Sequence, residues 1–267
     1  MKLLKYELKI KLKGLILWSL GILLLFLSGS MEFEGIANAN SESINVVLNY
    51  YPKIVLALMG ITESIDFSVL DGYTWVLGYF GTLIGAFYAI NLGNSIVNRE
   101  FIDKTFEFLF TKPKKRGYIL GIKILSGFIC LTGFSIITFL GSVLIMNPVD
   151  KNINITNLMF LSCLGTFFTS ILFYAISIFV STLFKKRALN TKILNCFFLI
   201  TFILGGVYDV IKNGEIIRYF SPLRYFLYDD ALKGHLNIIF IIITIILNSI
   251  LLLFSYKNFE KRDLTEI

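Results

Sequence analysis

The sequence predicts an all-α membrane protein with six transmembrane helices, an N-terminal amphipathic surface helix and a short cytoplasmic helix. Hydrophobic residues make up 56% of the 267 residues, charged residues only 16%, and the mean hydropathy is +0.75. Because a soluble chain of this size needs more polar surface, a bilayer must solvate the apolar excess. The apolar residues also form span-length runs, and the basic residues lie between alternate pairs of runs.

Each predicted span is a run of about 20 mostly apolar residues, since a helix rising ~1.5 Å per residue needs that length to cross ~30 Å of hydrocarbon. The runs are residues 14–30, 73–97, 119–146, 158–183, 193–210 and 236–256. No Gly/Ser-rich linker or low-complexity tract separates them. We therefore expect one transmembrane domain over residues 1–267.

The first run, 14–30, is the shortest, and its basic start and small residues at 28–30 also fit a secretory signal peptide. The preceding residues favour an uncleaved span, because they form two helical faces that only Lys11 interrupts. One face carries Lys2, Lys5, Lys9 and Lys13, and the other carries Leu4, Leu8, Leu12 and Leu15. Since such a helix lies along a membrane surface, we expect a surface helix over residues 2–13.

The basic residues predict the orientation of the spans. With both termini in the cytoplasm, the cytoplasmic segments contain 19 Lys and Arg residues and the outer segments contain 6. The acidic residues divide the other way, 7 inside and 11 outside. This distribution follows the positive-inside rule. A net charge of +7 spread around the spans also indicates contact with membrane lipid and not with nucleic acid.

One apolar segment between the first two spans is not predicted to cross the membrane. Residues 46–61 have a helical period, but Pro52 and Lys53 interrupt them and leave too short an apolar run. We expect an amphipathic helix on the outer surface, followed by a connection that contains Asp66 and Asp71.

The sequence offers no catalytic, cofactor-binding or metal-binding residue. It lacks GxxxxGK[ST], HExxH and GxSxG, so no motif for ATP binding or hydrolysis is present. The one histidine, His235, lies at the outer mouth of the last span without partner residues nearby in the sequence. The three cysteines lie inside apolar runs, without the spacing of a metal site.

The spans also lack the buried charges that ion-driven carriers use to bind coupling ions. Lys123 is expected to reach the cytoplasmic surface by snorkelling, and Asp209 lies at the outer end of its span. The polar residues that could line a substrate path are Asn91, Asn94, Asn195 and Asn248. Neutral groups of this kind also join helices through hydrogen bonds, so both roles remain open.

The cytoplasmic stretch 98–123 contains the predicted short helix, from Glu100 to Phe110. Glu100 and Asp103 are placed where a helix dipole favours negative charge, and Pro113 helps to end the helix. An apolar stripe at helical spacing consists of Ile102, Phe106, Leu109 and Phe110. Such a helix either lies on the membrane interface or docks into a protein socket.

The same stretch resembles the cytoplasmic signature of type 2 ABC transporter permeases, E-x-x-x-G-T-x-[DE]-x-L-x-x-x-P-x-x-R with a Lys seven residues later. The matching residues are Glu100, Thr105, Glu107, Leu109, Pro113, Arg116 and Lys123. The sequence departs at Lys104, where the family has Gly. Residues 51–60, 71–73 and 221–226 are similar to outer segments of the family, so the resemblance covers nearly the whole chain.

The resemblance implies the membrane-spanning subunit of an ABC exporter, which works as a dimer of identical or related permeases. Two copies of a partner ATP-binding subunit would bind ATP and Mg and would receive the coupling helix. The residues implied in this contact are Glu100, Thr105, Phe106, Glu107, Leu109, Pro113 and Arg116. The implied cargo is an apolar or amphipathic compound such as a drug, an antimicrobial peptide or a lipid.

Three alternatives remain at the level of sequence. They are a permease-like sensory or regulatory subunit that moves no cargo, an unrelated six-span secondary carrier, and a membrane-embedded enzyme. The excess of Lys over Arg, with abundant Ile and Asn, fits an AT-rich bacterial genome. We therefore expect a bacterial plasma membrane location.

Overall fold

A computed structural model describes residues 2–38, 48, 50–102, 116–150, 153–184, 186–211 and 214–261. Among them, six helices are long and apolar enough to cross a membrane and no strand occurs, so the predicted fold class is confirmed. These helices are α1 (Lys2–Asn38), α4 (Leu70–Ile102), α6 (Arg116–Met146), α7 (Thr156–Leu183), α8 (Arg187–Val210) and α11 (Ile238–Lys261). Each predicted span coincides with or overlaps one of them.

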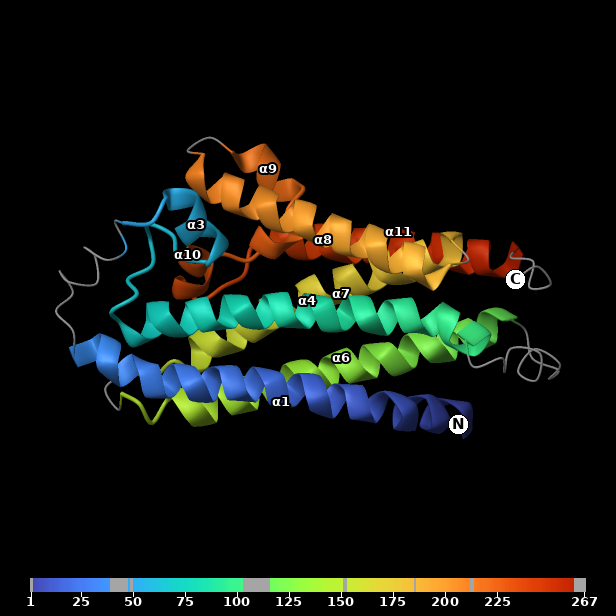
Figure 1. The fold of residues 1–267 in the computed structure, drawn as a ribbon, viewed down its shortest axis with the longest axis horizontal. Coiled ribbons are helices and arrows are strands. Elements are labelled where there is room, and N and C mark those ends of the chain that lie inside the picture. The colour runs from blue at the N-terminus through green and yellow to red at the C-terminus, as the bar shows by residue number, and fades with distance from the viewer. Residues whose placement is uncertain are drawn as a thin grey trace.

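Four short elements connect the spans on one side: α3 (Lys53–Leu58), α9 (Glu215–Tyr219), the 3-10 helix η1 (Pro222–Arg224) and α10 (Tyr228–Leu232). Figure 1 shows α3, α9 and α10 toward the left of the bundle, which we call the loop end. Both chain termini lie at the right, which we call the terminal end (Figure 1). Successive spans therefore alternate in direction, and six crossings put both termini on one side of the membrane.

The structure differs from the prediction at the N-terminus, because residues 2–13 and the first span form one continuous helix. The 37 residues of α1 correspond to about 56 Å of helix. Lys11, the residue that interrupts the pattern of two faces, is buried against α6. Its Nζ donates hydrogen bonds to Glu7 Oε2 at 2.7 Å and to Ser126 Oγ at 2.6 Å. These contacts hold the first turns of α1 against the bundle.

The centre of the bundle is the pair α4 and α7, two parallel helices that pack closely through small residues. Glycines of α4 face serines of α7 in the pairs Gly78–Ser162, Gly85–Ser170 and Gly93–Ser177. In addition, Ser177 Oγ donates a hydrogen bond to the carbonyl oxygen of Ile90 at 2.7 Å. Small residues let helix backbones approach in a membrane, where lipid supplies no hydrophobic drive for association.

The outer helices have the opposite character, since α1, α8 and α11 present large apolar side chains on their outward faces. Examples are Leu17 on α1, Ile203 on α8 and Leu253 on α11, each more than half exposed. Lipid or another membrane chain must cover such faces.

Lys123 on α6 does not snorkel as predicted. It is only 4% exposed, and its Nζ donates a hydrogen bond to the carbonyl oxygen of Ile96 at 3.0 Å. The sequence prediction was wrong because α4 and α6 pack closely enough at the terminal end to enclose the amine. A carbonyl in the last turns of α4 thus receives a charged donor.

Candidate functional site

The predicted contact with an ATP-binding partner falls mainly outside the described residues. Thr105, Phe106, Glu107, Leu109 and Pro113 belong to residues 103–115, so their roles stay predictions. The structure places the two flanks of this segment, which are the end of α4, where Glu100 lies, and the start of α6 at Arg116. Both flanks lie at the terminal end, beside the N- and C-terminal helices (Figure 1).

The four asparagines proposed to line a path divide into two groups. Asn94 is buried and joins α4 to two other helices. Its Nδ2 donates a hydrogen bond to Thr191 Oγ1 of α8 at 2.9 Å. Its Oδ1 accepts one from Ser181 Oγ of α7 at 3.2 Å. Asn248 is also buried and donates to the carbonyl oxygen of Thr244 in its own helix at 2.7 Å. These two join or brace helices within the chain.

Asn91 and Asn195 are exposed instead. Two contacts between α4 and α8 fix their relative depth, one between the rings of Phe87 and Phe198 at 4.1 Å and one between Asn94 and Thr191. Because the helices are antiparallel, residue 91 lies level with residues 194–195. The two exposed amides therefore share one depth of the α4–α8 pair, which we call the asparagine face.

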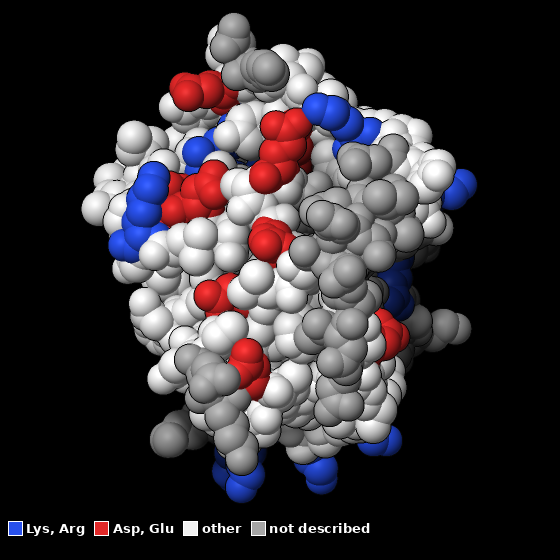
Figure 2. Space-filling view, turned by 90° about the vertical axis from the view of Figure 1, so that its left-hand side faces the viewer, with Lys and Arg blue, Asp and Glu red and all other residues white. Residues whose placement is uncertain are grey.

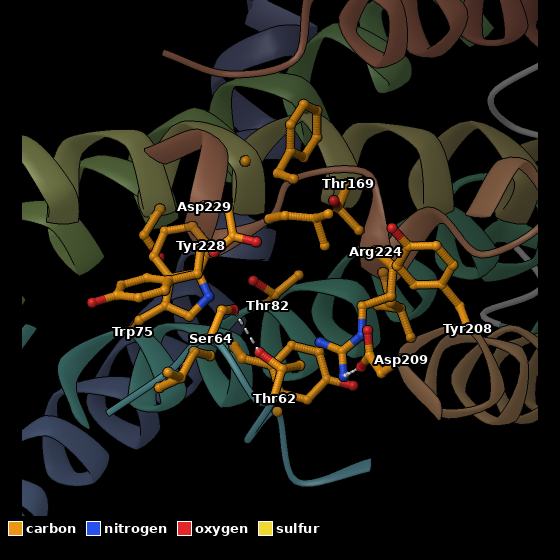
Figure 3. A pocket seen from close by; sticks show the side chains of 18 of the residues that line it. Thr62, Ser64, Trp75, Thr82, Thr169, Tyr208, Asp209, Arg224, Tyr228 and Asp229 are labelled. Atoms are coloured by element: carbon orange, nitrogen blue, oxygen red, sulfur yellow. Dashed lines mark hydrogen bonds and ion pairs between the residues drawn. The ribbon is translucent and has the colours of Figure 1, made fainter. Parts of the chain in front are cut away.

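A cavity lies at the loop end, between α4, α7 and α8 and beneath the segments 60–65 and 223–229. We call it the loop-end cavity, and its volume is about 360 Å³. Figure 3 shows its side chains in two groups, with Trp75, Tyr228 and Asp229 on one side and Tyr208, Asp209 and Arg224 on the other.

A buried ion pair closes one wall of the cavity. Arg224 Nη2 lies 2.6 Å from Asp209 Oδ2, and the two side chains are only 7% and 4% exposed. The same nitrogen donates to the carbonyl oxygen of Ala57 at 2.6 Å, and the guanidinium lies 4.2 Å above the ring of Tyr79. Arg224 thereby ties the loop at 221–226 to α3, α4 and α8.

A second arginine fixes the same loop from the side. Arg218 Nε donates a hydrogen bond to the carbonyl oxygen of Arg224 at 3.1 Å. Its Nη2 donates to the carbonyl oxygen of Tyr225 at 2.9 Å and lies 3.4 Å from Oδ2 of Asp230. Its guanidinium also stacks 4.3 Å from the ring of Phe240 on α11. Burial in this packing raises the pKa of Tyr225 to about 12. The loop is therefore held at a fixed position over the cavity.

Sequence reasoning counted Arg224 as an ordinary outer-loop charge and missed the ion pair. One signal could have found it, because Asp209 is a lone carboxylate at the end of an otherwise apolar span and needs a nearby cation. The hydroxyls on the cavity floor were also missed. Thr82 Oγ1 of α4 and Thr166 Oγ1 of α7 are hydrogen-bonded at 2.8 Å.

The comparison with known proteins identifies one match. A family model described as ABC-2 family transporter protein matches residues 1–264. The matched region includes every span, both flanks of the segment 103–115, the asparagine face and the loop-end cavity. No curated protein matches the chain.

Proposed function

Because the chain belongs to the ABC-2 family of transporter permeases, and is thus a membrane subunit that associates with an ABC ATP-binding subunit, we propose that it is the permease of an ATP-driven exporter. The observation that carries this proposal is the family match over residues 1–264 on a six-span bundle. The chain itself would supply no catalytic residue. ATP and Mg would be bound by the partner, present in two copies.

The proposed location is a bacterial plasma membrane with both termini in the cytoplasm. The terminal end of the bundle carries most of the basic residues, since 19 of the 25 Lys and Arg residues belong to its segments. The positive-inside rule assigns such an end to the cytoplasm. An ATP-binding subunit in the cytoplasm could then reach the segment that joins α4 to α6.

The segment from Glu100 to Arg116 would act as the coupling helix. It leaves the bundle from α4, which packs along α7 through the small-residue pairs described above. Displacement of the segment by the partner would therefore act directly on the central helix pair. Lys123 links α6 to α4 one turn before the segment begins, through its bond to Ile96, so both flanks would move together.

The substrate path would lie between two permease copies at their asparagine faces. Asn91 and Asn195 are exposed at one depth on α4 and α8, and an amide turned to lipid costs free energy that water or a second chain removes. Within residues 73–97 of α4 and 193–210 of α8, the only charged side chain is Asp209, which pairs with Arg224. This composition suits an apolar or amphipathic cargo such as a drug, an antimicrobial peptide or a lipid.

The test is transport by vesicles that contain the permease with its ATP-binding partner. The proposal expects ATP-dependent movement of a lipophilic dye out of the leaflet, and none when the partner carries a substitution that abolishes ATP hydrolysis. Hydrolysis that responds to ligands without any movement would indicate a regulatory subunit. Movement driven by an ion gradient without ATP would indicate a secondary carrier, and either result would overturn the proposal.

A further inference from the structure

The loop-end cavity has a negatively charged lining. Three carboxylates line it outside the Arg224–Asp209 pair, and they are Glu63, Glu215 and Asp229. Arg224 is the only Lys or Arg among the described lining residues, and Asp209 balances its charge. Glu63 pairs with Lys53 at 2.7 Å, whereas Glu215 and Asp229 are exposed and form no ion pair with any described residue. Figure 2, which looks onto the loop end, shows acidic side chains across this surface.

Aromatic rings lie beside these carboxylates. The rings of Trp75 and Tyr228 are 5.5 Å apart at an angle of 54°, and Asp229 follows Tyr228 directly on α10 (Figure 3). The pKa of Tyr228 is raised by burial and further by the carboxylates of Asp71, Asp229 and Asp66. The ring therefore sits in a negative field. Ring faces combined with carboxylates are the groups that attract organic cations.

We infer that the loop-end cavity binds an organic ammonium ion that carries an apolar group, with its cationic head in the cavity beside the rings of Trp75 and Tyr228 and its charge balanced by Asp229 and Glu215. A cavity of about 360 Å³ is at the small end of the ~300–1,000 Å³ range of ligand pockets, which fits one ring with an ammonium head. The inference concerns binding only, so it does not depend on ATP-driven transport or on the partner subunit.

The competing ligand is an anion held by Arg224. Arg224 Nε is buried and has no hydrogen-bond partner among the described residues. Two observations argue against an anion. First, the guanidinium already pairs with Asp209, donates to the carbonyl oxygen of Ala57 and stacks on Tyr79. An anion there would also face three carboxylates. The experiment must therefore compare a cation, a neutral molecule and an anion of similar size.

Tryptophan fluorescence supplies the measurement, because the chain has two tryptophans. A Trp18→Phe background leaves Trp75 in the cavity as the reporter. The full chain in lipid nanodiscs is titrated with benzyltrimethylammonium, with its neutral isostere neopentylbenzene, and with benzenesulfonate. Asp229→Asn combined with Glu215→Gln removes the two exposed charges. Asp150→Asn, a loop-end carboxylate that does not line the cavity, is the matched control.

We expect saturable quenching by benzyltrimethylammonium, with an affinity at least about tenfold above that of neopentylbenzene. The double variant should raise the Kd about tenfold or more, equivalent to about 1.4 kcal/mol, and Asp150→Asn should leave it unchanged. Equal affinities for the cation and its neutral isostere would overturn the inference. This comparison uses only the chain with Trp18→Phe and needs no further variant. Tighter binding of benzenesulfonate would assign the cavity to anions and would equally overturn it.

Discussion

The loop end and the asparagine face arrange their polar groups in opposite ways. At the loop end, the buried charges of Arg224 and Asp209 pair with each other within the same chain. On the asparagine face, Asn91 and Asn195 are exposed on helices that otherwise present apolar side chains. The buried charges of the loop end are therefore balanced within one chain. The amides of the asparagine face need water or a second chain beside them, which agrees with the proposed position of the substrate path.

The largest effect should come from breaking the ion pair at the loop end. Arg224→Met leaves Asp209 as an uncompensated charge in a buried site, which costs about 3–5 kcal/mol. Asp209→Leu added to Arg224→Met should recover most of this loss, because no charge then remains buried. The midpoint of thermal unfolding in detergent measures the stability of the single and the double variant. The exposed pair Lys53–Glu63, whose side chains are 77% and 84% exposed, is the control, and Lys53→Gln should change the midpoint little. Equal midpoints for Arg224→Met and Lys53→Gln would contradict the account.

A smaller effect should follow from adding a methyl group where α4 and α7 pack closely. A Cβ atom at Gly93 would lie 2.6 Å from Cβ of Ser177, whereas one at Gly21 on α1 would meet nothing within 4 Å. Gly93→Ala should therefore destabilise the chain by about 1–3 kcal/mol. Gly21→Ala should be neutral or slightly stabilising, because Ala is the better helix former. Similar unfolding midpoints for the two variants would mean that α4 and α7 do not pack as closely at Gly93 as described.

The smallest stability effect separates the two kinds of asparagine. Asn94→Leu removes hydrogen bonds to α7 and α8, each worth about 0.6 kcal/mol in a membrane. Asn91→Leu should leave the stability of the chain unchanged, since Asn91 bonds only within its own helix.

A cysteine at position 91, in a background without Cys130, Cys163 and Cys196, should cross-link two copies of the chain. Cross-linking from position 17 instead, on the outward face of α1, would place the second copy elsewhere.

Much of the fold could be predicted from the sequence, because length and hydropathy alone determine which segments can span a bilayer. The helices α4, α6, α7 and α8 contain their predicted spans completely. The burial of Lys11 and Lys123 could not be predicted, since it depends on how closely α1, α4 and α6 approach each other. A polar side chain within an apolar run has the same appearance in sequence whether a neighbouring helix covers it or not.

The candidate site was predictable only in part for a related reason. The Arg224–Asp209 pair joins residues from a loop and a span whose contact arises when the segment 221–226 folds back over the bundle. Among the four asparagines, residue type could not separate Asn94 from Asn91, because both occupy the same half of α4. The position of α8 decides which of them is covered.

The most direct test of the central claim is the contact between the coupling segment and the ATP-binding subunit. Phe106→Ala with Leu109→Ala should remove about 1.5–3 kcal/mol of apolar contact per side chain if both are buried in the partner. The measurement is the amount of ATP-binding subunit that co-purifies with the membrane-inserted permease, together with ATP-dependent transport. Lys114→Gln with Lys115→Gln is the control and should retain both, because lipid attraction is worth only about 1 kcal/mol per lysine. The account predicts that the Phe106/Leu109 variant loses the partner and the transport activity. Retention of both by that variant would contradict it.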